Sequence, residues 1–445
     1  MRNGKPIDAR IAYNQSSGLL RTVHGTNDRL FRRMILKRIL VIGAGFAGLW
    51  SALSAARKLD ELNRTEEAEV VIVNPAPFHS VRVRNYEQPL DPTLVQLDTV
   101  LGPAGVKLIQ AKATEIDSAA RRVSIEREGT AESLDYDRLI LAAGSVLVRP
   151  PIPGLDCHSF DVDTYAGACK LQAHLLTLPA LPDTPGRYTA VVVGAGLTGI
   201  ELAAELPARL REIVAEADRG KVRVVLADRS ATIAQSMGGA QPVIEGALKT
   251  LDVEVRAGVT LESLDEASVT LSDGTASERI EAATVVWCGG MHANALASQL
   301  PVTLDPLGRV PVDTFLRAEG VPGVFAAGDC ARILIDGTRP SVMSCQHGRP
   351  MGRYAGNNAV CDLFGLEMLP LSIDWYTTIC DLGPWGAVYT EGWDRKLVTQ
   401  GETAKATKRT INGERIYPPK SGTREDILRA ASPVVQTPPP TERPG

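Results

Sequence analysis

The chain has 445 residues, of which 44% are hydrophobic and 22% charged, and its formal net charge is -4. The length predicts two or three domains, and the nearly balanced charge argues against a nucleic-acid partner, which would require Lys and Arg clustered on a basic domain. No apolar run reaches the roughly 18 residues that a membrane-spanning helix needs, so we expect no transmembrane segment.

Residues 1–33 are rich in arginine and contain no apolar core segment, so they do not resemble a secretory signal. We expect this segment to be a disordered extension or to precede the true start of the protein. The seven cysteines are scattered, without a CxxC pair or zinc-ligand spacing. This pattern predicts no metal site and favours a reducing, cytoplasmic setting.

The first convincing strand, residues 39–42, leads into a glycine-rich turn, a helix to about Leu59 and a second strand at residues 70–73. Uninterrupted Val and Ile runs are typical of strands buried on both faces of a parallel sheet. In a GxGxxG turn the glycines allow a tight bend and a close approach of the backbone to a pyrophosphate, which the helix start attracts. The candidate cofactor-binding residues here are Gly43, Gly45, Phe46, Ala47 and Gly48.

Asn74 ends the second strand, at the position where a side chain receives the ribose hydroxyls of a nucleotide. An amide can bond such a hydroxyl through its carbonyl oxygen, so we include Asn74 among the cofactor-binding candidates. The alternative is that Asn74 only begins a turn ahead of Pro75.

The same pattern occurs again after a stiff, proline-rich crossing at residues 150–154. A strand at residues 190–193 precedes a second GxGxxG turn, a helix in which Pro207 predicts a kink or break, and a strand at residues 222–227. Two copies in the same context predict two dinucleotide-binding domains. The second copy contributes the candidates Gly194, Gly196, Leu197, Thr198, Gly199, Asp228 and Arg229.

Asp228 occupies the ribose-binding position of the second copy. Its carboxylate can accept hydrogen bonds from the 2′-hydroxyl of NADH and repel the 2′-phosphate of NADPH, at a cost on the order of 4 kcal/mol for charges about 4 Å apart. The adjacent Arg229 can offset a similar amount. We therefore expect NADH to be preferred and NADPH to be the poorer substrate.

A late segment, residues 323–329, ends in Gly328-Asp329 and can return to the first sheet. Its carboxylate would then point at the ribityl hydroxyls of a flavin, although a Gly-Asp pair alone is more often a turn. Small residues at the ends of two other strands, Ala143-Gly144 and Cys288-Gly289, let the backbone pass close to a cofactor. These features predict FAD in the first domain, with the further contacts Ala113, Ala143, Gly144, Gly289 and Asp329.

We expect residues 34–150 and 288–365 to form the FAD-binding domain and residues 151–287 to form the NAD(P)H-binding domain. Residues 366–432 change character and predict a small α+β C-terminal domain. Residues 433–445 hold five prolines, so we expect a disordered, solvated tail.

Residues 38–358 resemble the FAD-dependent pyridine nucleotide-disulfide oxidoreductase superfamily, which implies an α/β fold with two Rossmann-like, glutathione reductase-like domains. Within it, Gly199-Ile200-Glu201 and residues 344–353 resemble the type II NADH:quinone oxidoreductases. The resemblance places Glu201 near the nicotinamide and Gln346 beside the flavin and the quinone. His347 adjoins Gln346, and we include it, with these two, as a catalytic candidate for proton transfer. The implied reaction passes hydride from NADH to FAD and then electrons to a quinone-like acceptor.

Three features depart from that family. Met351 stands at the motif's second glutamine, Asn74 replaces the usual acid, and residues 423–429 are too polar to seat a terminal helix in a lipid interface. Disulfide reductases need a cysteine pair beside the flavin, but residues 43–90 and 194–287 contain no cysteine, which argues against a thiol relay. We expect Cys345 to be a buried structural thiol, and His79 a hydrogen-bonded structural residue.

Two alternative functions stay open. A reductase that supplies ferredoxin or rubredoxin would need a basic docking patch, for which the candidates are Arg82, Arg84, Arg349 and Arg353. A slow NADH-sensing flavoprotein would instead change conformation on reduction. We favour a small-molecule acceptor, and leave open a homodimer and weak peripheral contact with a membrane.

Overall fold

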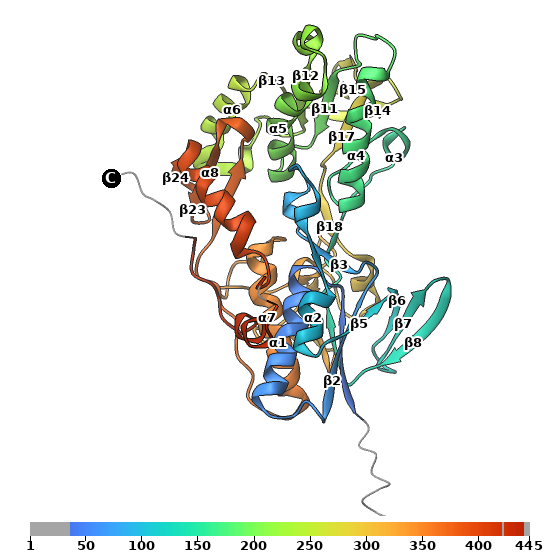
Figure 1. Ribbon diagram of the computed structural model, residues 1–445, viewed down its shortest axis with the longest axis vertical. Helices are drawn as coiled ribbons and strands as arrows, with labels where there is room; N and C mark the ends of the chain where they lie inside the picture. Colours follow the sequence, from blue (N-terminus) through green and yellow to red (C-terminus); the bar gives the residue numbers. More distant parts are fainter. Residues whose placement is uncertain (1–35, 421, 440–445) are drawn as a thin grey trace, which may run out of the picture. The chain divides into compact units, whose positions relative to one another are not determined.

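The computed structural model describes residues 36–420 and 422–439 (Figure 1). The expected extension, residues 1–33, lies outside the described residues, as do residues 440–445. Contacts divide the chain after Leu36, and every element below belongs to the unit that begins at Lys37. Within the described ranges, no helix has the length and apolar character needed to cross a membrane.

Five parallel strands form the sheet of the first domain, in the order β20-β9-β1-β2-β5. Their bounds are β1 (Lys37–Ile42), β2 (Ala68–Asn74), β5 (Lys107–Gln110), β9 (Arg138–Leu141) and β20 (Val324–Ala326). The Ile, Leu and Val side chains of β1 and β2 are almost completely buried, as their uninterrupted apolar runs predict. Val324 pairs with Leu139, so the late segment does return to the first sheet.

Four helices accompany this sheet: α1 (Phe46–Glu61), α2 (Asp98–Ala104), α7 (Cys345–Leu363) and α9 (Arg424–Ala430). Helices α1 and α7 pack against each other along much of their length. Glycines of α7 permit this contact, because a Cβ at Gly352 would overlap the carbonyl oxygen of Ala47 and a Cβ at Gly356 would overlap that of Ser51. The close packing brings the first turn of α7 beside the first turn of α1.

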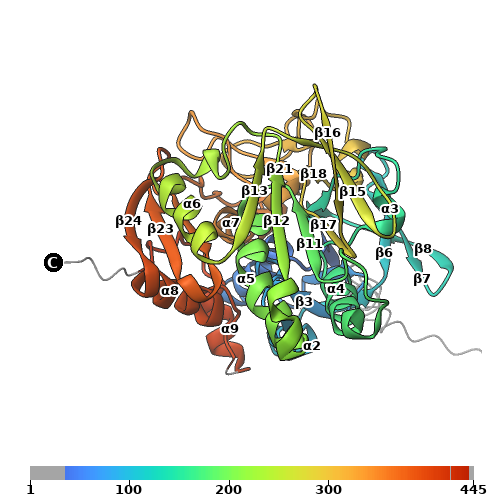
Figure 2. The same ribbon diagram turned by 90° about the horizontal axis from the view of Figure 1, so that it is seen from above.

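Four parallel strands form the second sheet, in the order β13-β12-β11-β17, and lie side by side in Figure 2. The strands and their helices are β11 (Thr189–Val193), β12 (Arg223–Asp228), β13 (Val253–Ala257), β17 (Thr284–Trp287), α4 (Tyr165–Thr177), α5 (Leu197–Ile213) and α6 (Gln241–Thr250). In each sheet the glycine-rich turn follows an inner strand, which is β1 in the first sheet and β11 in the second. The predicted α/β fold with two Rossmann-like domains is confirmed.

Helix α5 continues through Pro207, so of the predicted kink or break the break does not occur. The proline removes one backbone hydrogen bond. However, Leu206 and Leu210 on either side of it are fully buried in the core of the second domain. Packing on both sides of the proline therefore keeps the helix continuous.

Short elements complete the two domains: β3 (Phe78–Ser80) with β4 (Leu94–Gln96), β6 (Lys112–Asp117) with β7 (Arg122–Arg127) and β8 (Thr130–Asp135), β10 (Ser145–Leu147) with β18 (Met291–Ala293), β14 (Thr260–Leu264) with β15 (Ser268–Ser272) and β16 (Ser277–Glu281), β19 (Val310–Pro311) with β21 (Ala331–Arg332), and α3 (Leu155–His158). The β10–β18 pair joins the segment after β9 to the segment after β17. The chain thus crosses between the two domains there.

The C-terminal part is a three-stranded antiparallel sheet with one helix: β22 (Thr377–Asp381), β23 (Ala387–Glu391), β24 (Lys396–Gln400) and α8 (Gly401–Thr410). A π-helical turn, Ile411–Arg415, follows α8. Strand β22 contacts α5 of the second domain, and α8 packs on β22 and β23. The small α+β part therefore covers the side of α5 that carries Glu201.

Residues 433–439 do not form the solvated tail that the prolines suggest. Val435 packs against the core of the first domain. The side chain of Gln436 accepts a hydrogen bond from Arg349 at 2.8 Å, and the Thr437 carbonyl accepts one from Arg415 at 2.6 Å. Hydrogen bonds from Arg349 and Arg415 thus hold this extended segment against the rest of the protein.

Candidate active site

The two glycine-rich turns have the same construction. Gly43 and Gly194 adopt positive φ values of 94° and 109°, which favour glycine. A Cβ at Gly48 would overlap the Gly43 carbonyl oxygen, so this glycine is needed for the turn to pack on its own helix. In contrast, a Cβ at Gly45 or at Gly196 would have no neighbour within 4 Å. The backbone at these two positions is open to a ligand that approaches the helix N-terminus.

Asn74 and Asp228 occupy equivalent places, each closing the turn of its own copy. The Asn74 Oδ1 accepts a hydrogen bond from Ala44 N at 2.9 Å, and the Asp228 Oδ2 accepts one from Ala195 N at 2.6 Å. The second oxygen of Asp228 accepts from Ser230 N at 2.7 Å. Partial burial raises the pKa of Asp228, but the hydrogen bonds from Ala195 and Ser230 and the charge of Arg229 together lower the pKa below its ordinary value. Asp228 is therefore ionised at neutral pH.

Asp329 lies at the start of a short turn after β20 and faces the first domain. Its Oδ2 accepts a hydrogen bond from the Ser145 hydroxyl at 2.6 Å. Arg82 donates to the Ser145 carbonyl at 3.1 Å, lies 4.0 Å from the Asp329 carboxylate and forms an ion pair with Asp163. Burial raises the pKa of Asp329, whereas the Ser145 hydroxyl and the Arg82 charge lower it. The carboxylate is thus placed by a small polar network.

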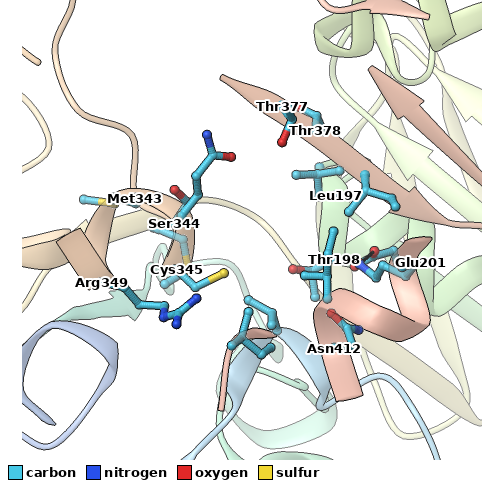
Figure 3. A pocket seen from close by; sticks show the side chains of 18 of the residues that line it. Leu197, Thr198, Glu201, Met343, Ser344, Cys345, Arg349, Thr377, Thr378 and Asn412 are labelled. Carbon is cyan, nitrogen blue, oxygen red and sulfur yellow. Dashed lines mark hydrogen bonds and ion pairs between the residues drawn. The ribbon is translucent and has the colours of Figure 1, made fainter. Parts of the chain in front are cut away.

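A cavity of about 510 Å³ lies where the two domains and the C-terminal part meet. Figure 3 shows Met343, Ser344, Cys345 and Arg349 on one side, Leu197, Thr198 and Glu201 on the other, and Thr377 and Thr378 of β22 across the cavity. Of the predicted site residues, the lining includes Gly196, Leu197, Thr198, Gly199, Glu201 and Gln346. One space therefore contacts the second nucleotide-binding turn, the first turn of α7 and the C-terminal sheet.

Glu201 is 5% exposed and is held by groups from the C-terminal part. Its Oε1 lies 2.6 Å from Lys408 Nζ and accepts a hydrogen bond from Asp381 N at 3.0 Å. Lys405 forms an ion pair with Asp381, whose carboxylate also accepts a hydrogen bond from Tyr86 at 3.2 Å. We call Glu201, Asp381, Lys405 and Lys408 the paired cluster. It connects α5, β22 and α8 through charges.

The pKa values of Glu201 and Lys408 are both raised above their ordinary values. Burial raises the pKa of Glu201 to about 7, although the Lys408 charge and the hydrogen bonds of the cluster lower it. Burial lowers the pKa of Lys408, but the Glu201 carboxylate outweighs burial and raises it. Both shifts favour the protonated forms. Glu201 can therefore take up or release a proton near neutral pH beside the cavity.

The histidine candidates do not line the cavity. His347 is fully buried, its Nδ1 accepts a hydrogen bond from Val342 N at 2.9 Å, and burial lowers its pKa to about 4. His79 donates from Nδ1 to the Ala44 carbonyl at 2.9 Å, and burial lowers its pKa to about 4 as well. Both rings are neutral at physiological pH. The geometry gives no support to proton transfer by His347.

Residues around Gln346 differ in how they face the cavity. The Gln346 amide nitrogen lies 3.5 Å from the Trp375 carbonyl oxygen. Cys345 also lines the cavity, and burial raises the pKa of its thiol. Met351 is packed in the core of the first domain, whereas Pro350, one residue earlier, lines the cavity. Met351, which stands where the family motif has its second glutamine, therefore does not face the cavity.

The remaining predicted contacts lie outside the cavity lining. Those on the two nucleotide-binding turns and strand ends are Gly43, Gly45, Phe46, Ala47, Gly48, Asn74, Ala143, Gly144, Gly194, Asp228, Arg229 and Gly289. Arg229 is exposed, and a Cβ at Gly289 would overlap the Trp287 ring. Ala113 lies on β6 and pairs with Ile125. In the part of the chain that the structure describes, no group of three His, Cys, Asp or Glu side chains could hold a metal ion.

The four arginines considered for a basic docking patch do not form one. Arg82 pairs with Asp163 and Arg84 with Glu87. Arg349 and Arg353 are only 6% and 3% exposed. No basic surface for a redox protein follows from these residues.

The sequence interpretation missed the residues that the C-terminal part contributes. Lys408 lies on α8, a helix that is mostly polar, and the local sequence does not distinguish it from a lysine on a solvated helix face. Asn412 and Thr378 likewise carry no local signal. Only the tertiary contact of α8 with α5 and β22 shows that they face the site.

Comparisons with known proteins agree with this geometry. The sequence model of the pyridine nucleotide-disulphide oxidoreductases matches residues 37–352. An NADH dehydrogenase-like protein of Mycobacterium tuberculosis is 54% identical over 403 residues, covering 90% of this chain and 99% of that protein. A type II NADH:quinone oxidoreductase of Staphylococcus aureus is 26% identical over 367 residues, covering 78% of this chain and 88% of that protein.

Solved structures show the same fold at low sequence identity. NDH2 from Plasmodium falciparum in complex with NADH superposes with a TM-score of 0.73 at 14% identity, over 89% of this chain and 97% of that one. The sulfide:quinone oxidoreductase of Aquifex aeolicus gives a TM-score of 0.71 at 17% identity, over 87% of this chain and 92% of that one. The fold is therefore shared by proteins whose sequences differ widely.

Proposed function

The chain belongs to the pyridine nucleotide-disulphide oxidoreductase family and is an NAD(P)H oxidoreductase, and we propose that it oxidises NADH with FAD and passes the electrons to a quinone-like acceptor. One observation carries the proposal: a single cavity is lined both by the second nucleotide-binding turn and by the first turn of α7, opposite the C-terminal sheet. A nicotinamide held by the glycine-rich turn before α5 would meet, in that space, a flavin held by the glycine-rich turn before α1.

The first domain fits FAD. The open backbone at Gly45 leaves room for a pyrophosphate at the N-terminus of α1. Asn74 has a second lone pair on the oxygen that bonds Ala44, and this lone pair is free to accept from a ribose hydroxyl. The Asp329 carboxylate, held by Ser145, would receive hydroxyls of the ribityl chain. FAD, when bound, supplies the hydride and electron chemistry that side chains lack.

The second domain fits NADH. The open backbone at Gly196 is the equivalent place for its pyrophosphate. Asp228 is ionised, so it would accept hydrogen bonds from a ribose and repel a 2′-phosphate. Leu197, Thr198 and Glu201 line the way from this turn to the cavity. The nicotinamide would lie next to Glu201.

Glu201 would exchange protons at this end of the cavity, and Lys408 would position its carboxylate. Reduction of a quinone to a quinol takes up two protons, so a buried acid with a pKa of about 7 is suited to exchange them. Lys408 fixes the position of that carboxylate at 2.6 Å. Gln346 on α7 and the residues of β22 would orient the acceptor from either side of the cavity. The Staphylococcus aureus relative, an NADH:quinone oxidoreductase, supports this choice of acceptor.

Anaerobic stopped-flow absorbance of the purified holoprotein tests the proposal. We expect NADH to bleach the flavin rapidly, NADPH to do so more slowly, and menadione to restore the oxidised spectrum. The matched control omits the nucleotide and should show no bleaching. A protein that binds no FAD, or that neither nucleotide bleaches, would contradict NADH oxidation. Bleaching without reoxidation by menadione would contradict the quinone-like acceptor and leave the NADH half-reaction standing.

A further inference from the structure

A second cavity of about 510 Å³ lies beside the first, around Trp50 on α1. Helix α7 forms one wall, and the chain from Gly413 to Gln436 forms the other. The two cavities share three lining residues, Arg349, Arg415 and Gln436. The second cavity therefore adjoins the active site on the side of α7.

Two buried guanidinium groups face this cavity. Arg353 lies over the Trp50 ring at 4.2 Å from its centroid, and Arg349 lies at 5.3 Å. Arg349 donates to the Gln436 side chain at 2.8 Å, and Arg353 makes one long bond of 3.5 Å to the Val434 carbonyl. The Nε atoms of both are buried without a hydrogen-bond partner. These donors are left over after the protein's own contacts.

No carboxylate of the described residues forms an ion pair with either arginine, although both are more than nine-tenths buried. Burying a charge without a counter-charge costs several kcal/mol, and proteins normally pair such groups. Burial lowers the pKa of Arg349 to about 9 and that of Arg353 to about 10. A stack on one tryptophan offsets only part of that cost. An anion would offset the remaining cost.

The other charged groups around the cavity increase the positive charge. Arg415 is half-buried and bonds only backbone carbonyls, and Lys420 and Arg429 are exposed at the rim. Arg429 is paired with Asp426. Glu414, which is exposed, is the one acidic residue of the described chain in the lining. The cavity thus collects five cationic side chains against one carboxylate.

We propose that this cavity is an anion-binding site, in which Arg349 and Arg353, stacked on Trp50, hold a carboxylate or phosphate group. Guanidinium groups bind both anions through paired N–H donors, and the Nη2 atoms of both arginines form no hydrogen bond with the described residues. Trp50 and Tyr417 give the cavity aromatic walls, so the ligand carries its anionic group on an organic body. The site stands on these contacts and does not depend on the proposed function.

Thermal unfolding of the flavin-loaded protein tests the site. Inorganic phosphate and succinate are the two probes, each compared with chloride at equal ionic strength. We expect both to raise the Tm of the wild type. In Arg353→Met the rise should be lost, because removing one charge-assisted contact weakens anion affinity at least about tenfold. In chloride this variant should be as stable as the wild type or more stable, since an unpaired buried charge is gone.

Two further variants keep the test decisive. Arg309 is equally buried, at 6% exposed, but pairs with Asp305 at 2.8 Å. Arg309→Met should lose stability in chloride and keep the response to phosphate and succinate. Lys420→Met, at the rim, should fold normally and weaken the response less than Arg353→Met does. If only phosphate acts, the ligand is a phosphate compound, and if succinate acts more strongly, it is a carboxylate.

The opposite results would overturn the site. Loss of stability in Arg353→Met, together with no effect of either anion on the wild type, would make Arg353 a structural residue of the Trp50 stack. An equal Tm rise in wild type and Arg353→Met would place anion binding elsewhere, for example at the open Gly196 turn.

Discussion

Two sets of buried charges face the active-site region and are treated differently by the fold. In the paired cluster, Lys408 and Lys405 each lie on a carboxylate, and the carboxylates also accept bonds from a backbone amide and a tyrosine. On the other side of the cavity, Arg349, which lines it, and Arg353, which lines the adjoining second cavity, have no acidic partner among the described residues. The first set is explained by contacts inside the chain, whereas the second calls for a ligand.

The difference also separates stability from binding. Removing one member of a pair leaves its partner charged and buried, which is strongly destabilising. Removing an unpaired charge takes away a cost that the protein already bears. The same kind of substitution should therefore have opposite effects on the free energy of unfolding on the two sides of the cavity.

Lys408→Met is expected to have the largest effect. It leaves Glu201, which is 5% exposed, without its cation, and breaking such a buried pair costs about 3–5 kcal/mol. We expect the free energy of unfolding, measured with urea at pH 8, to fall by this amount. At pH 5 the loss should be smaller, because Glu201 can then be protonated.

The double variant Lys408→Met with Glu201→Gln is the matched control for this prediction. It removes both charges together, so most of the lost stability should return. If Lys408→Met alone is as stable as the wild type at pH 8, the pair does not carry its charge in solution. The contrast between the two clusters would then fail.

The pH dependence of stability should reveal Glu201 in the wild type. Its pKa is raised from 4.5 in the unfolded chain to about 7 in the fold, so the folded state binds the proton more tightly. Its contribution is therefore complete below pH 4.5 and is lost as the pH rises to about 7, by about 3 kcal/mol in total. Urea unfolding at pH 4.5, 6, 7 and 8 measures this slope.

Glu201→Gln removes the titrating group and should flatten the curve over that range. The activity should show the same group, as an inflection near pH 7 in the rate of quinone reduction that Glu201→Gln abolishes. A wild-type curve that rises between pH 4.5 and 7 would mean that Lys408 holds Glu201 ionised, with its pKa below the ordinary value.

Local patterns were enough to predict the two glycine-rich turns and the return of β20 to the first sheet. Each of these depends on a few neighbouring residues, such as Gly194 to Glu201. The family resemblance, and not a local pattern, singled out Glu201 and Gln346, which line the cavity. The roles of Lys408 and Arg353 could not be predicted from the sequence, because each depends on tertiary contacts, with Glu201 and Trp50 respectively. Pro207 and His347 show the same limit, because packing around each residue decides its role. Packing keeps α5 continuous at Pro207, and burial keeps His347 neutral and away from the cavity.

Asp228 extends the comparison to a charge whose partners are backbone amides, and its replacement should have the smallest effect on stability. In Asp228→Asn the bond from Ala195 can persist, because Asn74 makes the same bond to Ala44 in the first copy. The bond from Ser230 is lost, which costs about 1 kcal/mol of the free energy of unfolding. The repulsion of a 2′-phosphate also disappears, so the preference for NADH over NADPH in kcat/KM should fall about tenfold or more.

Asn74→Asp is the matched control, since it changes the equivalent position of the other copy and should leave that preference unchanged. If Asp228→Asn keeps the wild-type preference, discrimination lies elsewhere in the second domain, and the carboxylate serves only to close the turn.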